Sequence, residues 1–276
     1  MQSRVVCALL AIGASILSLN AAACDLDHWS SVAATVPGVS LKAGQPDDTT
    51  PVSRYSGYCA MVASAPGNYV NDESPNSETK FYARFYVLAA TSGGPVTIFR
   101  ARNAASTTML AVRYTGSTFE FITRGANFAA SPPVVAGRWY SIQLSWLPGS
   151  PMTAKIQGAG SAALPLVTTE ASLAGDRVDS VSLGWIEGAG TGSITIDAYE
   201  SRRLTAVGRL CRGNADANHL RDGHDQTSAR DEFLKSSLAK GQPDCNEDGS
   251  VDSGDLVCIR NMEQGGQGDC DSFPDL

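Results

Sequence analysis

The sequence has little of what hydrolytic catalysis usually requires. It contains three histidines among 276 residues and no G-x-S-x-G segment, which argues against a Ser-His-Asp hydrolase. It also lacks an E-x-D-x-x-E or E-x-D-x-E run, which would place a pair of glycosidase carboxylates on one strand. Glu120, Asp197 and Glu200 are interpreted as surface charges, the last two on opposite faces of their strand. These absences favour a non-catalytic protein.

Long apolar runs are also scarce. The one candidate, Val5–Leu19, has about 15 residues, whereas a membrane-spanning helix needs roughly 20. Its charged start and the small residues after it indicate a secretory signal peptide, residues 1–23. The mature protein is therefore expected to be secreted, periplasmic or attached to the cell surface, with no transmembrane segment. Lipidation of Cys24 is disfavoured because Ala21 stands where a lipobox usually has leucine.

Six cysteines remain after removal of the signal peptide, an even number that favours three disulfides in an oxidising compartment. The two near the start suggest a Cys24–Cys59 bridge. The remaining four could pair in three ways, which the sequence does not distinguish: Cys211, Cys245, Cys258 and Cys270.

Negative charge is concentrated in the tail. Residues 211–276 carry 14 acidic and 6 basic side chains, a net charge of -8, while the rest of the chain has a net charge of +1. An acidic segment of this size repels nucleic acid and anionic lipid, so no nucleic-acid partner is expected. In an exported protein it favours the binding of a hard cation.

Short runs rich in Val, Ile, Thr, Tyr and Phe fill residues 27–204, separated by Gly, Pro, Ser and Asn. This pattern predicts a mainly β protein with a two-sheet antiparallel sandwich. The predicted strands are Lys80–Ala89, Val96–Ala101, Met109–Tyr114, Phe119–Thr123, Trp139–Trp146, Thr153–Gln157, Ser180–Ile186 and Ser193–Glu200.

Three stretches, Tyr69–Val87, Gly137–Trp146 and Val178–Arg203, together resemble the concanavalin A-like or laminin-G-like jelly roll of secreted bacterial proteins. The resemblance implies a domain over residues 24–207 that binds a glycan or surface ligand. It also implies a role in polysaccharide binding or catabolism or in cell-surface adhesion, with a glycan-degrading enzyme as the alternative.

A sugar-stacking platform could be built from four aromatic residues, Tyr86, Trp139, Trp146 and Trp185. Packing in the sandwich core is the favoured interpretation of these residues, because sandwich cores normally contain one or two tryptophans.

The strongest motif is an EF-hand-type calcium loop from Asp244 to Asp255. Such a loop supplies oxygen ligands from alternate residues and bends at a glycine in its sixth position, here Gly249. The predicted ligands are Asp244, Asn246, Asp248, the carbonyl of Ser250, Asp252 and Asp255. The expected cofactor is therefore Ca²⁺.

Aspartate at the twelfth position and helical spacing in Ser228–Lys240 and Asp252–Met262 give residues 211–276 a resemblance to a type I dockerin. The resemblance implies two calcium loop-helix units and a protein partner of the cohesin type. A second, weaker site is expected from a first loop whose spacing needs two insertions: Asp216, Asn218, Asp222 and Asp231, with Gly223.

The tail departs from most dockerins in having four cysteines, and Ser253-Gly254 replaces the Ser-Thr pair that many use in recognising cohesin. Within this resemblance, a Cys211–Cys270 bridge would clasp the ends of the module, and Cys245–Cys258 would tie the second loop to its helix. A transition-metal site at His219 and His224 is disfavoured, because exposed loop histidines are the commoner case.

Overall fold

The computed structural model describes residues 26–27, 29–33, 39–43, 54–124, 127–158, 163–218 and 220–264. The predicted signal peptide, Cys24 and Cys270 lie outside these ranges. Within them, neither helix is long and apolar enough to cross a membrane.

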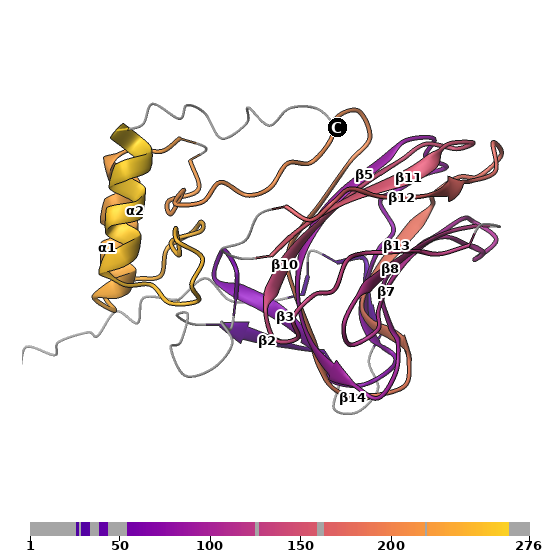
Figure 1. Ribbon diagram of the computed structural model, residues 1–276, viewed down its shortest axis with the longest axis horizontal. Coiled ribbons are helices and arrows are strands. Elements are labelled where there is room, and N and C mark those ends of the chain that lie inside the picture. Colours follow the sequence, from indigo (N-terminus) through magenta and orange to yellow (C-terminus); the bar gives the residue numbers. More distant parts are fainter. Residues whose placement is uncertain are drawn as a thin grey trace, which may run out of the picture.

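Two seven-stranded antiparallel sheets form most of the molecule, and two helices lie beside them (Figure 1). The first sheet has the order β1 (Ser31–Ala33), β4 (Asn68–Asp72), β13 (Ser180–Gly188), β6 (Val96–Arg102), β7 (Thr108–Tyr114), β8 (Phe119–Thr123) and β9 (Ala129–Ala130). The second has the order β12 (Val167–Ala171), β11 (Pro151–Gly158), β10 (Trp139–Trp146), β5 (Phe81–Ser92), β14 (Thr191–Arg202), β3 (Cys59–Ala63) and β2 (Val39–Ala43). The chain crosses repeatedly from one sheet to the other, as at β4 to β5 and β5 to β6.

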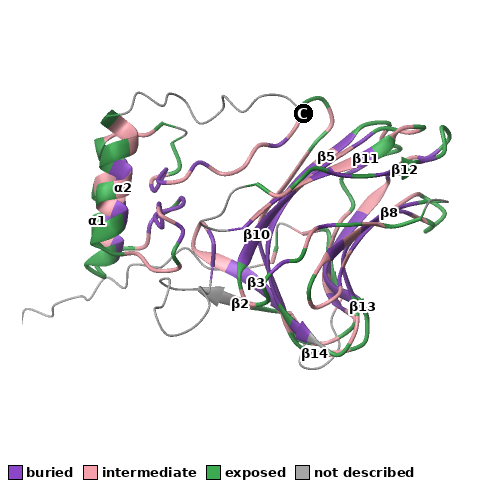
Figure 2. Ribbon diagram, viewed as in Figure 1, coloured by how far each residue is buried: buried purple, intermediate pink, exposed green. Residues whose placement is uncertain are grey.

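Many strand residues are buried (Figure 2), and the apolar side chains of alternate residues form one core between the sheets. Phe85 of β5 stacks on Phe99 of β6 with ring centroids 5.5 Å apart, which joins the two layers. Trp146 and Trp185 are fully buried, and the indole Nε1 of Trp146 donates to Ser172 Oγ at 3.0 Å. Tyr86 and Trp139 are also buried, on the other face of the second sheet. The prediction that these residues pack in the sandwich core is therefore confirmed for Trp146 and Trp185, whereas Tyr86 and Trp139 are buried outside that core.

All eight predicted strands occur, with ends within three residues of those expected. The other six strands, β1, β2, β3, β4, β9 and β12, have five residues or fewer. Segments this short give few alternating positions, and among the strands of five residues or fewer only β8 was predicted.

The predicted orientation of Asp197 and Glu200 is wrong. The register of β14 shifts between them, and both pair with outward-facing residues of β5, Tyr86 and Arg84. Ala198, directly after Asp197, has a φ of 49°, so the strand bulges there and the alternation of faces is interrupted. The prediction assumed the alternation of faces in a regular strand, and this alternation gives no sign of a bulge.

The first helix begins earlier than predicted: α1 spans Gly223–Phe233 instead of Ser228–Lys240. Asp222 caps it by accepting from the N–H of His224, and Asp225 completes a capping box. Lys235, just beyond the helix, has a left-handed φ of 59°, which stops it from continuing. The second helix, α2, spans Ser253–Gln264, close to the predicted Asp252–Met262.

Gly192, at the start of β14, should not tolerate a side chain. Its φ is +113°, and an added Cβ would overlap the carbonyl oxygen of Ala90 on β5. We expect Gly192→Ala to lower the free energy of unfolding by about 1–3 kcal/mol, measured by urea denaturation. Gly175→Ala is the matched control, because nothing lies within 4 Å of its Cβ position. An equal stability of the two variants would contradict the assigned backbone conformation.

Candidate metal centre in the tail

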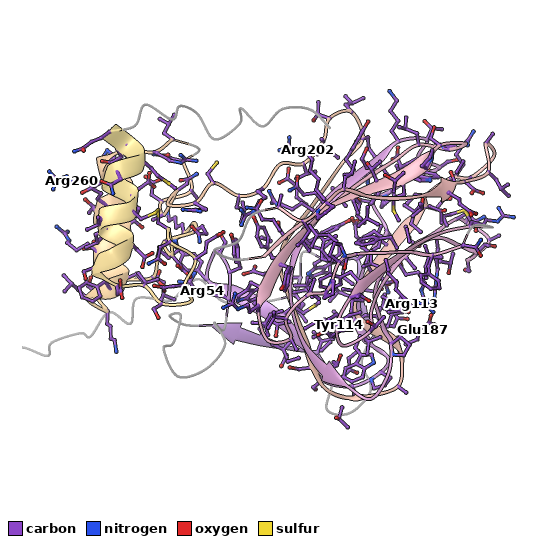
Figure 3. All side chains as sticks on the ribbon, in the orientation of Figure 1. Arg54, Arg113, Tyr114, Glu187, Arg202 and Arg260 are labelled. Carbon is purple, nitrogen blue, oxygen red and sulfur yellow. A yellow bond between two sulfur atoms is a disulfide. The ribbon has the colours of Figure 1, made fainter. Side chains whose placement is uncertain are left out.

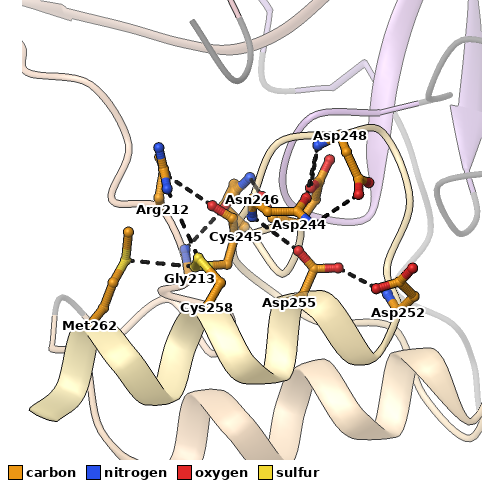
Figure 4. Close-up of a disulfide and its surroundings, with 11 residues drawn as sticks. Arg212, Gly213, Asp244, Cys245, Asn246, Asp248, Asp252, Asp255, Cys258 and Met262 are labelled. Carbon is orange, nitrogen blue, oxygen red and sulfur yellow. Dashed lines mark hydrogen bonds between the residues drawn. A yellow bond between two sulfur atoms is a disulfide. The ribbon is translucent and has the colours of Figure 1, made fainter. Parts of the chain in front are cut away.

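The loop from Asp244 to Asp255, called loop 2, is closed by two inward-turned carboxylates (Figure 4). Asp244 accepts from the backbone N–H groups of Asp248 at 3.1 Å and Gly249 at 3.0 Å. Asp255 accepts from those of Asn246 at 3.0 Å and Asp252 at 2.9 Å. Gly249 has a φ of 102°, which gives the sharp bend that the sequence motif anticipated. The two carboxylates therefore hold the loop from its first and last residues.

The segment from Asn214 to Asp225, called loop 1, repeats the part of this arrangement that the last aspartate makes. Asp225 accepts from the backbone N–H groups of Asp216 at 3.2 Å and Asp222 at 3.0 Å. Each of these residues lies thirty positions before its counterpart in loop 2. The same offset relates the residues with left-handed backbone at the fourth position, Ala217 with a φ of 63° and Glu247 with a φ of 58°.

This repeat changes the expected register of loop 1. Its positions 1, 3, 5, 9 and 12 are taken by Asn214, Asp216, Asn218, Asp222 and Asp225. This register needs no insertion, and Asp231 lies inside α1, paired with Arg230 at 2.9 Å, outside the hydrogen-bonded part of loop 1. The sequence held a signal for this register, since D-x-x-D closes both loops. The asparagine in the first position hid it.

Asn214 occupies the position that Asp244 holds in loop 2. It is 9% exposed, and its Oδ1 is buried without a hydrogen-bond partner in the described part of the chain. A buried amide oxygen without a partner is costly, and a cation in loop 1 would satisfy it. His219, at the sixth position of loop 1, lies outside the described residues.

The acidic groups of the two loops resist ionisation. Burial and the charge of Asp255 raise the pKa of Asp244 to about 8, and burial raises the pKa of Asp255 to about 6. Burial also raises the pKa of Asp225. Each shift reports an environment that disfavours a carboxylate, and a bound cation would reverse that preference.

The donor types fit calcium, because both loops present carboxylate, amide and carbonyl oxygens, the hard ligands that Ca²⁺ takes. The described residues contain no group of three or more His, Cys, Asp or Glu side chains already arranged to hold a metal ion. The carboxylates are instead turned to backbone N–H groups of their own loops. Ion binding would therefore require the side chains of a loop to converge.

A disulfide and a small core support the loops. Cys245 of loop 2 is bonded to Cys258 of α2, the pairing expected for the tail. Five buried residues pack between the helices and loops: Ala215, Ala229, Ala239, Cys245 and Ile259. Cys59 and Cys211 are also disulfide-bonded. Their expected partners, Cys24 and Cys270, lie outside the described residues.

The sandwich carboxylates considered for catalysis are engaged in structural contacts. Asp197 is buried and accepts from the backbone N–H groups of Tyr55 at 2.6 Å and Ser56 at 2.9 Å, so its interpretation as a surface charge is wrong. Glu200 pairs with Arg84 at 3.1 Å and with Arg202 at 2.7 Å. Glu120 pairs with Arg113 at 2.7 Å. These contacts do not form an open acid-base pair.

The raised pKa values predict how pH affects the metal-free protein. A carboxyl group with a higher pKa in the folded state stabilises folding while it is protonated, so this contribution is lost as pH rises through about 6 and then about 8. We expect the urea midpoint of the helical signal at 222 nm to fall between pH 5 and pH 8.5. Asp244→Asn should reduce the slope over the whole window and flatten it above about pH 7, whereas Asp197→Asn should reduce it only below about pH 7. A midpoint that rises over this window would contradict the assignment.

Comparisons with known proteins give no family. No family model matches the chain, and no curated protein matches its sequence. Among solved structures, the cellulose induced protein Cip1 is similar over 62% of this chain and 88% of its own, with 12% identity and a TM-score of 0.42. The receptor binding domain of botulinum neurotoxin D covers 60% of this chain and 44% of its own, with 11% identity and a TM-score of 0.39. A sialidase covers 65% of this chain and 18% of its own, with 12% identity and a TM-score of 0.38. Likeness at this level carries no conclusion about activity.

Proposed function

We propose that this chain is a secreted, non-catalytic calcium-binding protein whose tail holds two Ca²⁺ ions and whose β-sandwich binds a glycan. The hydrogen bonds that Asp225 and Asp255 make in loops 1 and 2 support the calcium part, because they repeat with an offset of thirty residues and place Asp or Asn at the same ligand positions of both loops. An open polar strip on the second sheet supports the glycan part.

In loop 2 the ion would be held by Asp244, Asn246, Asp248, the carbonyl of Ser250, Asp252 and Asp255. In loop 1 it would be held by Asn214, Asp216, Asn218, the carbonyl of Leu220, Asp222 and Asp225. Loop 1 has three carboxylates and loop 2 has four, so loop 1 is the weaker site. Calcium neutralises the loop carboxylates when bound, and its binding free energy then adds to the stability of the tail.

Calcium titration of the oxidised mature protein tests both the site and the register. We expect wild type to bind two ions by calorimetry, and Asp244→Ala and Asp225→Ala each to lose one. Asp231→Ala should keep both, since Asp231 lies in α1 away from the frame of loop 1.

Loss of an ion in Asp231→Ala with retention in Asp225→Ala would overturn the thirty-residue register. Absence of calcium binding in wild type would overturn the proposed function of the tail. Refolding of each variant is checked by its helical signal before titration.

The polar strip consists of Tyr82, Gln143, Ser145, Thr153 and Lys155. Strand pairing places Gln143 between Arg84 and Lys155, and Ser145 between Tyr82 and Thr153, all on the outer face of the second sheet. The five side chains are partly exposed, and none has a side-chain hydrogen bond or ion pair to another described residue. One tyrosine ring with adjacent amide, hydroxyl and ammonium groups offers stacking and hydrogen bonds to a sugar.

Binding to polysaccharides tests this strip. Insoluble cellulose, chitin and xylan are incubated with wild type, with a Tyr82→Ala/Gln143→Ala variant, and with Arg177→Ala as a control at a partly exposed residue outside the strip. We expect wild type and Arg177→Ala to be retained on at least one polymer, and the double variant to bind it about tenfold more weakly, since a stacking contact and a hydrogen bond are lost. Equal retention of the double variant, or no retention of wild type on any polymer, would exclude the strip as a site for these polymers.

Calcium-dependent assembly with a protein partner is the alternative function of the tail. Three large apolar side chains of the helices and their ends are exposed: Phe233 at 41%, Leu234 at 62% and Val257 at 59%. Exposed apolar side chains favour a protein contact over a purely structural tail. A glycan-degrading activity is not favoured by the described carboxylates.

A further inference from the structure

The tail is fastened to the sandwich by the segment from Arg54 to Gly57, which precedes β3. The side chain of Arg54 lies between the sandwich and the helices (Figure 3). Its Nη2 donates to Glu232 Oε1 of α1 at 2.5 Å, and neither side chain is exposed. The N–H of Gly57 donates to the carbonyl of Gly241, between α1 and loop 2, at 3.2 Å. Removing one partner of a buried ion pair strongly destabilises the folded protein, because the other charge is left buried without a partner. The association of the tail with the sandwich therefore depends on this contact.

The connection between the two parts is also held against the second sheet. Arg84 of β5 donates to the carbonyl of Gly208 at 2.9 Å, and Tyr86 of the same strand accepts from the N–H of Leu210 at 3.0 Å. The ring of Tyr86 stacks on that of Tyr55, with centroids 3.7 Å apart. The tail therefore has little freedom to move on its connection.

A second buried carboxylate, Glu247, extends from loop 2 to the sandwich. The hydroxyl of Tyr55 donates to Glu247, and Arg209 Nη2 donates to the same carboxylate at 2.5 Å. Glu247 is 5% exposed and Tyr55 is 6% exposed, so the contact is shielded from water. Burial and the nearby carboxylate raise the pKa of Tyr55, which keeps the phenol protonated as the donor.

Glu247 is the fourth residue of loop 2, between two backbone groups that hold the loop closed. The N–H of Asn246 before it is bound by Asp255, and the N–H of Asp248 after it is bound by Asp244. Its own φ of 58° is left-handed and unfavourable for a glutamate, so the closed loop imposes this conformation. The carboxylates that would ligate calcium thus fix the position of Glu247.

We propose that calcium in loop 2 locks the tail onto the sandwich through Glu247, with Tyr55 and Arg209 as its receptor. The inference rests on the proposed calcium site. A bound ion would hold Asp244 and Asp255 in their ionised form and would thereby stabilise the closed conformation of loop 2 that places Glu247 against Tyr55 and Arg209. Closure of the loop and the buried contact are then stabilised together.

Calcium binding at loop 2 and docking of the tail on the sandwich affect each other equally, because linkage between two equilibria is reciprocal. If calcium strengthens docking of the tail, then docking strengthens calcium binding by the same factor. A change in the sandwich receptor, which offers no ligand to the ion, must therefore weaken calcium binding at loop 2.

Tyr55→Phe tests this linkage in the full mature chain. It removes the hydroxyl that contacts Glu247 and leaves every loop residue in place. We expect the calcium affinity of the site that Asp244→Ala removes to fall at least about fivefold, measured by calorimetry. Tyr199→Phe is the matched control, since the Tyr199 hydroxyl donates to Asp72 at 3.1 Å within the sandwich.

Hydrogen exchange of the Gly57 amide gives a second readout, because its hydrogen bond crosses to the tail. We expect calcium to slow exchange at Gly57 in wild type and in Tyr199→Phe, with a smaller effect in Tyr55→Phe. Exchange in the core of β5, from Phe85 to Val87, should not respond to calcium.

The outcomes separate the two proposals. Absence of calcium binding in wild type would overturn the proposed function, and the lock with it. Calcium binding with equal affinity in Tyr55→Phe and Tyr199→Phe, together with unchanged exchange at Gly57, would overturn the lock alone.

Discussion

Buried negative charge is the constraint on which the tail depends. A carboxylate removed from water must be matched by a cation or by hydrogen-bond donors, or it becomes protonated. The tail uses two of these solutions. Glu232 and Glu247 are matched by arginines of or next to the sandwich, whereas Asp225, Asp244 and Asp255 are matched by backbone N–H groups of their own loops. Calcium would add a cation to the second group of carboxylates and, through Glu247, would stabilise the first.

The sandwich follows from simpler physics. Its strands alternate apolar and polar residues, and the apolar residues meet in one core between the sheets. This regularity is why strand positions such as Trp139–Trp146 could be predicted to the residue. The same regularity failed at β14, where the left-handed Ala198 shifts the register and brings Asp197 and Glu200 to one face.

The structure of the tail could be predicted where a local sequence motif specifies it. It could not be predicted where it depends on contacts between residues far apart in the sequence. Asp244 to Asp255 carries a complete ligand pattern, so the loop and the helix after it could be recognised from the sequence. Asn214 stands where loop 2 has an aspartate, and this difference concealed the matching pattern of loop 1. The helix predicted at Ser228–Lys240 relied on Phe233 and Leu234 as buried residues, but both are exposed. The contacts of Arg54 with Glu232 and of Tyr55 with Glu247 join residues 178 and 192 positions apart, and no local pattern indicates such pairs.

The bonds that hold Gly208 and Leu210 against β5 also set the geometry of anything that the two parts bind. A flexible tether lets two bound ligands sample many separations, and their effective concentration falls as the tether lengthens. Here the connecting segment is fastened to the sheet that carries the polar strip. A protein bound to α1 or α2 and a polymer bound to the strip would therefore be held at a fixed distance and a fixed orientation relative to each other.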